Sequence, residues 1–309
     1  MIMKTFKKFI TLLCLSVLIF VSGCGWPGLS GSSKDTIRVA SLSTTESMIL
    51  AEIIMQLISH ETNHNTEIVN NLGSGQLVHQ ALVNGDADIA SANFTGNELI
   101  TTLNHAPIKN EKKANATVKR LYKQRFDETW MPTYGFADTY NMLVTQETAK
   151  KYHLNKISDL KKIAPKIDIG ADNIWMNRPD DGYDAFSQAY GFKFKRVYPM
   201  QIGLVYSAVA AGKMSAVLGY STDGRIKSYN LKVLPDDKNF FPPYDTSMVV
   251  NNSTFKKYPE LKPLLHRLDG KISVDQMQTM NYEVDNNLRE PADVAKQFLT
   301  QHNYFRGDK

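Results

Sequence analysis

Cysteine is almost absent from this chain of 309 residues: there are two, Cys14 and Cys24, and both lie close to the N-terminus. The rest of the sequence therefore offers no disulfide, no thiolate nucleophile and no cysteine ligand for a metal. The serine-hydrolase pattern G-x-S-x-G is also missing. These absences exclude cysteine-dependent catalysis and the usual serine-hydrolase arrangement.

Strong charge of one sign is lacking too. The formal net charge is +5, and three of the lysines lie before Cys24, where there is no acidic residue. The chain from Cys24 onward therefore carries only +2. No cluster of Lys and Arg interleaved with aromatic side chains occurs, so we do not expect nucleic-acid binding.

Long apolar runs are absent except at the start of the chain. Three lysines in residues 4–8 precede an apolar run from Phe9 to Val21, and Ser22-Gly23-Cys24 follows. This order predicts a lipoprotein signal peptide over residues 1–23, with the lipid attached to Cys24. The alternative is an ordinary secretory signal with an incidental cysteine. Two acyl chains would hold the protein durably at the outer face of the cell membrane, and residues 24–35 read as a flexible tether.

After the tether, strand-like and helix-like segments alternate, which predicts an α/β fold. Ser43 and Glu46 have the spacing of a capping box before an amphipathic helix over 48–59, and Ser158 is a candidate cap for a short helix. The expected strands are 36–43, 66–72, 87–94, 140–145, 166–170, 195–198 and 215–219. The expected helices are 48–59, 75–83, 147–153, 203–212 and most of 254–300.

Three segments stand where predicted strands end and a turn or helix begins. They are Ser43 to Glu46, Phe94 to Asn97 and Tyr220 to Asp223. In open α/β sheets, ligands collect beyond the carboxyl ends of the strands and near helix N-termini. The sequence therefore predicts that these segments line a cleft between two α/β modules.

Three stretches carry a family resemblance: NGDADIASANFTGNEL (84–99), YPMQIGLVYSAVAAGKMSAVLGYSTDGRIK (198–227) and FFPPYDTSMVV (240–250). They are similar to osmoprotectant-binding lipoproteins of ABC importers, and the likeness runs from about residue 36 to 305. It implies a type II periplasmic-binding-protein fold, two-lobed, with two crossing hinge strands. Lobe 1 would comprise residues 36–138 and 246–309, and lobe 2 residues 139–245.

The resemblance also implies a function without catalysis, cofactor or metal. The protein would act as a monomeric receptor outside the cytoplasm, binding glycine betaine, carnitine or choline. It would deliver the ligand to a membrane permease that is driven by an ATPase subunit.

The family holds the quaternary ammonium group in a cage of aromatic rings, whose positions correspond here to Phe94, Tyr140, Tyr220 and Tyr244. A trimethylammonium group has no N–H to donate, so its diffuse charge suits π-faces, each worth about 0.5–2 kcal/mol when desolvated. Phe94 stands where relatives usually have Tyr, so that ring keeps its π-face without a hydroxyl.

Two further positions concern the other end of the ligand. Leu42 stands where relatives often have Gln, which removes a side-chain donor. Asn97 matches a polar position of the family and is the candidate contact for the carboxylate or hydroxyl end.

Two other functions remain open. A receptor of the same fold for an amino acid would need a carboxylate-binding arginine in the cleft; Arg178 and Arg225 are candidates, although salt bridges are the commoner role for such residues. An enzyme would use His60-Glu61-Thr62-Asn63-His64, which matches the H-E-x-x-H zinc pattern. That pattern needs a continuing helix, whereas the apolar period stops near Ser59. We expect Tyr206 and Trp175 to be structural.

Overall fold

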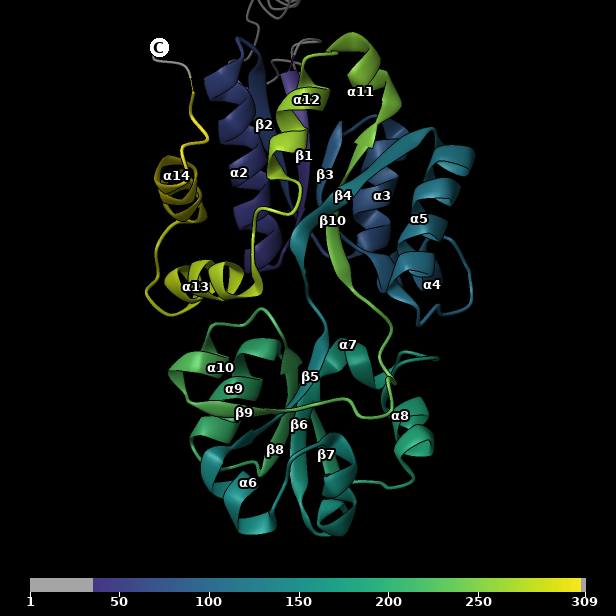
Figure 1. Cartoon of the computed structure of the whole chain (residues 1–309), viewed down its shortest axis with the longest axis vertical. Coiled ribbons are helices and arrows are strands. Elements are labelled where there is room, and N and C mark those ends of the chain that lie inside the picture. Colours follow the sequence, from purple (N-terminus) through teal and green to yellow (C-terminus); the bar gives the residue numbers. More distant parts are fainter. Residues whose placement is uncertain (1–35, 307–309) are drawn as a thin grey trace, which may run out of the picture. The chain divides into compact units, whose positions relative to one another are not determined.

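The computed structural model of the chain describes residues 36–306. The predicted signal peptide, Cys24 and the tether lie outside these residues. Ten strands in this part of the chain form two five-stranded sheets (Figure 1). The described residues from 37 onward group into one compact unit, so the two sheets belong to the same body.

The first sheet has the strand order β2-β1-β3-β10-β4. Its strands are β1 (Thr36–Leu42), β2 (Asn65–Leu72), β3 (Ile89–Phe94), β4 (Glu128–Ala137) and β10 (Asp245–Asn251). β1 and β3 run parallel, with Val39 opposite Ile89, whereas β10 runs antiparallel to both β3 and β4.

Successive side chains of a strand point to opposite faces of a sheet. Both faces of the first sheet are apolar, and helices cover both of them. Val39 packs into one apolar cluster together with α2, α13 and α14, and the next residue, Ala40, packs into another cluster with α3, α4 and α5. The helices on this sheet are α2 (Thr45–Glu61), α3 (Gly75–Asn84), α4 (Thr95–Thr101), α5 (Glu111–Phe126), α11 (Asn252–Lys257), α12 (Leu261–Leu265), α13 (Val274–Asp285) and α14 (Pro291–Gln301).

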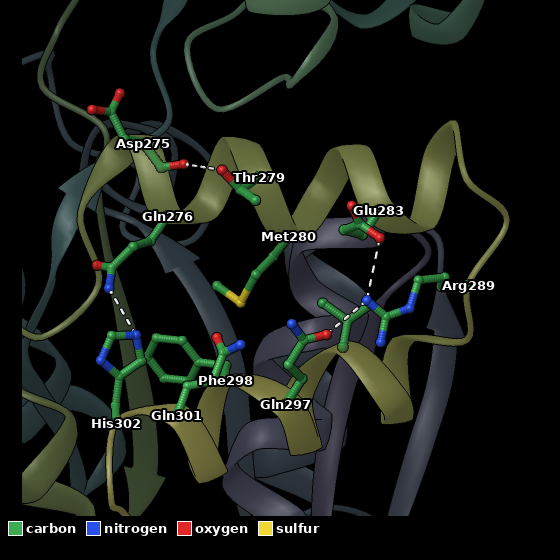
Figure 2. A pocket seen from close by; sticks show the side chains of 11 residues that line it. Asp275, Gln276, Thr279, Met280, Glu283, Arg289, Gln297, Phe298, Gln301 and His302 are labelled. Carbon is green, nitrogen blue, oxygen red and sulfur yellow. Dashed lines mark hydrogen bonds and ion pairs between the residues drawn. The ribbon is translucent and has the colours of Figure 1, made fainter.

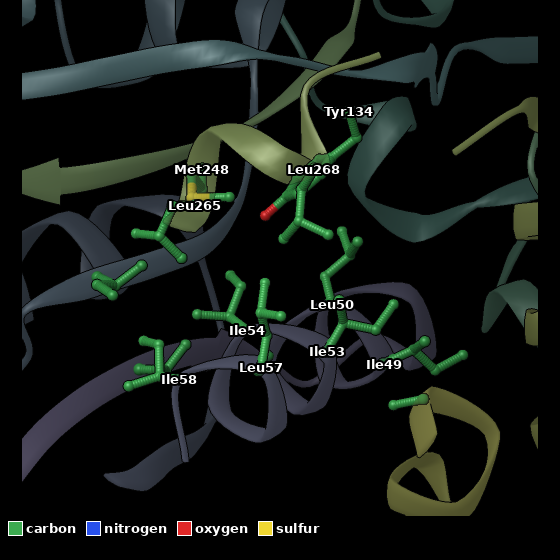
Figure 3. Packing of buried hydrophobic residues seen from close by; sticks show 14 of the residues in the cluster. Ile49, Leu50, Ile53, Ile54, Leu57, Ile58, Tyr134, Met248, Leu265 and Leu268 are labelled. Atoms are coloured by element: carbon green, nitrogen blue, oxygen red, sulfur yellow. The ribbon is translucent and has the colours of Figure 1, made fainter. Parts of the chain in front are cut away.

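The core on the α2 side is aliphatic. Six fully buried residues follow the 3.6-residue period of α2: Ile49, Leu50, Ile53, Ile54, Leu57 and Ile58. Figure 3 shows them facing Tyr134, Met248, Leu265 and Leu268. Burying each such side chain stabilises the fold by about 1.5–3 kcal/mol, so this face anchors the first sheet.

The second sheet has the order β7-β6-β8-β5-β9. β6 pairs in parallel with β7 and β8, whereas β5 is antiparallel to β8 and β9. Its strands are β5 (Tyr140–Thr145), β6 (Asp168–Asp172), β7 (Arg196–Met200), β8 (Ala216–Tyr220) and β9 (Leu231–Leu234). Its helices are α6 (Gln146–Tyr152), α7 (Asn173–Met176), α8 (Tyr183–Tyr190), α9 (Ile202–Ala210) and α10 (Arg225–Ser228). The described chain also has three short 3₁₀ turns, two of which lie on the side of this sheet.

The chain passes between the sheets twice, once from β4 to β5 and once from β9 to β10. The two passages touch, because the backbone N–H of Asp138 donates to the carbonyl oxygen of Tyr244 at 3.1 Å. This arrangement confirms the predicted two-lobed α/β fold with two connecting segments.

Two details of the sequence-based prediction were wrong. α2 begins at Thr45 after Thr44, which makes no side-chain cap bond, so Ser43 does not form a capping box with Glu46. The turn at Ile157–Lys162 is capped at Lys156, where the Asp159 carboxylate accepts from the backbone, and Ser158 does not cap it. Within residues 36–306, every helix is too short or too polar to cross a bilayer.

Candidate binding site

Strand pairing brings two of the predicted cage residues together. Tyr140 begins β5 and Tyr220 ends β8, and they are direct partners in the antiparallel register. Their ring centroids are 5.4 Å apart, with 50° between the planes. Tyr244 lies edge-on to Tyr140, at 5.8 Å and 89°. Three rings from three segments therefore meet around Tyr140.

Phe94 joins this group from the first sheet. It ends β3 and packs both against the core of the first sheet and against the aromatic cluster of the second. Tyr140 and Tyr244 are 8% and 4% exposed, whereas Phe94 and Tyr220 are only partly buried. All four predicted cage residues therefore contact one aromatic cluster.

The backbone of Tyr220 is held by Tyr206. The Tyr206 hydroxyl accepts from the Tyr220 N–H at 2.7 Å and donates to the Tyr220 carbonyl oxygen at 3.2 Å. Gly219 makes this approach possible, since a Cβ there would lie 2.5 Å from the Tyr206 hydroxyl. Tyr206 is fully buried and makes these bonds from α9, so it fixes the backbone of the predicted cage residue Tyr220.

A second close approach places Tyr244. The backbone at Pro242 and Pro243 passes directly over α4, and a Cβ on Gly96 would lie 2.7 Å from the Pro243 carbonyl oxygen. Proline fixes φ and stiffens the segment before Tyr244. Gly96 therefore permits the passage from β9 to β10 to lie against the segment that carries Phe94.

The hydroxyls of two of the predicted cage tyrosines donate to buried carboxylates. Tyr220 donates to Asp172 Oδ2 at 3.0 Å, and Tyr244 donates to Asp181. Burial raises the pKa of both phenols well above the ordinary value. At neutral pH the rings therefore remain neutral donors.

Arg178 links this cluster to the first sheet. It pairs with Asp181 through Nε at 2.6 Å and Nη2 at 2.9 Å, and its Nη1 donates to Asn97 Oδ1 at 2.9 Å. Its guanidinium carbon lies 5.9 Å from the centre of the Tyr244 ring. The Asn97 amide nitrogen in turn donates to Glu98 at 3.3 Å, so both ends of the Asn97 amide are engaged.

Leu42 lies apart from the aromatic cluster. It ends β1 and packs against the apolar cluster shared by α3, α4 and α5. Its backbone N–H donates to Ser47 Oγ at 2.9 Å. Of the six predicted binding residues, five are thus linked through the rings and Arg178, and Leu42 is not in contact with the rings.

The other two predicted cleft segments meet beside the passage from β4 to β5. Asp138 accepts from Thr222 Oγ1 at 2.9 Å, and Asn281 of α13 donates to the Thr222 carbonyl oxygen at 3.0 Å. Glu46 is 5% exposed, and neither carboxylate oxygen is in hydrogen-bond geometry with a protein group. Burial, followed by repulsion from Asp138, raises the pKa of Glu46 well above its ordinary value.

Sequence reasoning missed the carboxylates beneath the rings. Asp172 is the last residue of β6, whereas the predicted strand ended at residue 170. With a strand two residues longer, the rule that placed Phe94 and Tyr220 at strand ends would have included Asp172. Asp181 had no such signal, because it lies in the loop between α7 and α8. Trp175, expected to be structural, is fully buried and donates to the Asp181 carbonyl oxygen at 2.7 Å.

The histidines of the zinc pattern are not on one helix. α2 ends at Glu61, so His60 lies in its last turn and His64 beyond it. His60 bonds to Glu61 at 3.1 Å and stacks on Phe305, whereas His64 bonds to Glu260 at 2.5 Å. Within residues 36–306, no group of three or more His, Cys, Asp or Glu is arranged to hold a metal ion.

A cavity of about 240 Å³ lies away from the rings, between α13 and α14 (Figure 2). Its floor includes Met280 and Phe298, and its rim is polar. Arg289, the rim cation, is engaged by Glu283 at 3.2 Å and by Gln297 at 2.7 Å. This hollow therefore lacks the convergent aromatic faces found around Tyr140.

Comparison with known proteins agrees with this geometry. Over 304 residues, 97% of this chain and 99% of the relative, the chain is 52% identical to the carnitine transport binding protein OpuCC of Listeria monocytogenes serotype 1/2a (strain 10403S). It is 35% identical to the ergothioneine transport permease/ergothioneine binding protein EgtU of Helicobacter pylori (strain G27), with 84% of this chain matching 46% of that longer protein.

A solved structure is also similar. The crystal structure of a glycine betaine/carnitine/choline ABC transporter superposes with a TM-score of 0.80 at 49% identity, covering 87% of this chain and 99% of that chain. Residues 35–301 match the substrate binding domain of ABC-type glycine betaine transport systems. The chain belongs to this family and is a substrate-binding component of an ABC transporter.

Proposed function

We propose that this protein captures a quaternary ammonium osmoprotectant, namely glycine betaine, carnitine or choline, among Phe94, Tyr140, Tyr220 and Tyr244. The observation that carries the proposal is the meeting of three tyrosine rings around Tyr140, with Phe94 packed against them from the other sheet. Relatives named for carnitine and glycine betaine transport support it.

The chemistry of the rings fits such a ligand. A trimethylammonium group cannot donate a directional hydrogen bond, so carboxylates alone discriminate it poorly from other cations. Aromatic faces attract its charge and pack against its methyl groups, with about 0.5–2 kcal/mol for each desolvated ring. The raised phenol pKa values of Tyr220 and Tyr244 keep these rings neutral, so the attraction does not depend on ionised phenolates.

Ligand capture is coupled to movement of two lobes, which comprise residues 36–138 with 246–309 and residues 139–245. Rings from both lobes contact one ligand, so a ligand with higher affinity for the closed arrangement shifts the population toward it. The closed form then docks on a permease that an ATPase subunit drives. The receptor acts outside the cytoplasm as a monomer without catalytic activity.

Membrane attachment is part of the same proposal. Cys24 carries the lipid, residues 1–23 are removed as the signal peptide, and residues 24–35 tether the lobes to the outer face of the membrane. The support is the order of basic, apolar and small residues before Cys24. Mass spectrometry of the membrane-extracted protein tests this, since a Cys24→Ala variant should lose the acyl mass and the membrane association.

Asn97 and Leu42 face the variable end of the ligand in this proposal. Asn97 reaches the carboxylate or hydroxyl, and Arg178 stands next to it. Leu42 is apolar where relatives often have Gln, so we expect it to affect which quaternary amine binds most tightly. Their roles are testable by comparing ligands that share a trimethylammonium head but differ in their tail.

The decisive test is calorimetric titration of the soluble domain with glycine betaine, carnitine, choline and a panel of amino acids. We expect saturable binding of at least one quaternary amine. Tyr220→Ala should weaken it by tenfold or more, because one ring of about 1.4 kcal/mol corresponds to a factor of ten. His60→Ala is the matched control and should leave the affinity unchanged, since His60 lies on α2 and stacks on Phe305.

A receptor for an amino acid is the second candidate, and the position of Arg178 beside Tyr244 is the observation in its favour. Against it, Asp181 already engages this guanidinium through two of its nitrogens. Binding of an amino acid without any response to quaternary amines would select this candidate.

A further inference from the structure

Asp172 lies directly behind one of the cage rings. It ends β6, is 6% exposed, and accepts a hydrogen bond from the Tyr220 hydroxyl at 3.0 Å. The same carboxylate oxygen accepts from the backbone N–H of Ile174 at 3.1 Å, at the start of α7. β6 and β8 are parallel neighbours, so Asp172 and Tyr220 end adjacent strands at the same edge of the second sheet.

The two carboxylates of the cluster differ in their charge partners. Asp181 is paired with Arg178, and the side chains of this pair are 2% and 11% exposed. Asp172 takes part in no ion pair with a lysine, arginine or histidine of the described chain, residues 36–306. Its partners are a neutral phenol and backbone N–H groups. One negative charge of the cluster is therefore left without a cation.

This imbalance is costly for the protein without ligand. Burial raises the pKa of Asp172, and the bonds from Tyr220 and the backbone lower it only in part. A buried carboxylate is stabilised most when a positive charge comes within a few ångströms. Tyr220, which donates to Asp172, is only partly buried, and the proposed ligand would bring such a charge to this ring.

We propose that Asp172 is a specificity-determining residue, whose charge makes the aromatic cluster select cations over neutral molecules of the same shape and plain cations over zwitterions. This inference rests on the proposed function and deepens it. Asp172 is a positioning residue, since it orients Tyr220 and acts on the ligand across that ring.

The physical basis is the long range of the Coulomb interaction. The attraction between a carboxylate and an ammonium falls only as the inverse of their separation, so one intervening ring weakens it without abolishing it. A carboxylate that accepts from a phenol also increases the electron density of the ring, which strengthens cation–π attraction. A zwitterion gains less, because its own carboxylate is repelled by Asp172.

A purely structural role for Asp172 is the alternative. Its side chain accepts from the first turn of the four-residue helix α7, as an N-cap does. Asn caps helices as well as Asp does, and its amide oxygen can accept from the Tyr220 hydroxyl. Asp172→Asn therefore removes the charge while both hydrogen bonds keep an acceptor.

The test compares three probes in calorimetric titration. Choline is a plain cation, its carbon isostere with a tert-butyl group is neutral and has the same shape, and glycine betaine is a zwitterion. In Asp172→Asn the dissociation constant of choline should rise about tenfold and that of glycine betaine about threefold. The constant of the neutral isostere should change by less than about twofold.

Asp168→Asn is the matched control. Asp168 begins the same strand, about 13 Å away at the usual rise per residue, and the substitution changes the net charge equally. It should leave the ratio of choline to isostere affinity unaltered.

The outcomes separate the two levels of the proposal. If the natural chain binds no quaternary amine, the proposed function fails. If it binds them and Asp172→Asn weakens all three probes by the same factor, or none, the charge role of Asp172 is overturned while the proposed function stands. If Asp168→Asn changes the ratio of choline to isostere affinity as much as Asp172→Asn does, the effect comes from the overall charge of the protein. That result would also overturn the charge role of Asp172.

Discussion

Arg178 Nη1 donates to Asn97 Oδ1 at 2.9 Å, which joins the α7–α8 loop of the second sheet to the start of α4 on the first. The same guanidinium pairs with Asp181, and Asp181 accepts from Tyr244. One polar chain therefore runs from the first sheet through Arg178 to the ring of Tyr244. If the rings hold the proposed ligand, this contact lies beside it.

Replacing Asn97 should reduce ligand affinity more than stability. Asn97→Ala removes the contact with Arg178 and the proposed contact with the polar end of the ligand. A hydrogen bond to a charged ligand carboxylate contributes about 1.5–3 kcal/mol, so we expect the dissociation constant to rise at least about threefold after partial compensation by water. Arg178 keeps both of its bonds to Asp181 in the variant, so thermal unfolding without ligand should change by less than about 1 kcal/mol. A large loss of stability with unchanged affinity would contradict this assignment.

Removing Arg178 should destabilise the fold through Asp181. Arg178→Met leaves a carboxylate that is 2% exposed without its cation, and breaking a buried pair in this way costs about 3–5 kcal/mol. The double variant Arg178→Met, Asp181→Asn removes the stranded charge and should recover most of that loss. Chemical denaturation of the natural chain, the single variants Arg178→Met and Asp181→Asn, and the double variant measures the coupling between the two side chains. Equal stability of Arg178→Met and the double variant would show that the pair is not buried in solution.

Gly219 should be intolerant of a side chain because Tyr206 occupies the space. Gly219→Ala places a Cβ 2.5 Å from the Tyr206 hydroxyl, and we expect a loss of about 1–3 kcal/mol together with weaker ligand binding. Tyr206→Phe removes the nearest atom but leaves the ring carbons Cζ and Cε1 at 2.7 Å and 2.9 Å from the new Cβ, so its addition to Gly219→Ala should recover little of the stability. It should not recover the affinity, since the bonds that hold the Tyr220 backbone are lost.

The carboxylates of Glu46 and Asp138 should make stability depend on pH. Burial raises the pKa of Asp138 from the ordinary 3.8 to about 7, and the pKa of Glu46 is also raised. The folded protein therefore holds protons that the unfolded chain has released. Its free energy of unfolding should fall as pH rises from about 4 to about 7 through Asp138, and Glu46 should add to the fall until pH passes its own raised pKa.

Glu46→Gln tests this dependence, because its amide can donate where the carboxylate cannot. The variant should be more stable than the natural chain at pH 8 and equal to it at pH 4. Other charged or titratable groups face the same site, namely Asp223, Arg225, Asp285 and the neutral phenol of Tyr134, so the difference between the two proteins is the quantity to measure. Glu52→Gln on the same helix is the control. A difference that does not vary with pH would contradict the raised pKa values.

Periodicity in the sequence predicted most strands and helices because each has one uniformly buried face. The apolar row of α2 is an example, and the alternation from Val39 to Ala40 is another. Residues 95–137 gave no such signal: α4 is short, and α5 is mostly polar with four buried positions. The predicted capping box was wrong because the spacing of Ser43 and Glu46 does not determine where the strand ends and the helix begins.

The rings of the site were predicted through family resemblance, and their contacts required the fold. Nothing in the local sequence places Tyr140 opposite Tyr220, since that pairing depends on the register of β5 against β8. The partners of the hydroxyls were beyond sequence reasoning for the same reason. Asp181 reaches Tyr244 from 63 residues away. Leu42, which the family resemblance placed among the binding residues, packs against the apolar cluster shared by α3, α4 and α5.

A crystal structure of the soluble domain with bound glycine betaine would show whether the four rings hold the quaternary ammonium group. We predict that the trimethylammonium group lies within about 6 Å of the ring centres of Phe94, Tyr140, Tyr220 and Tyr244, with its carboxylate toward Asn97. A ligand found with its methyl groups in solvent and its carboxylate on Arg178, or held in the cavity between α13 and α14, would contradict the account.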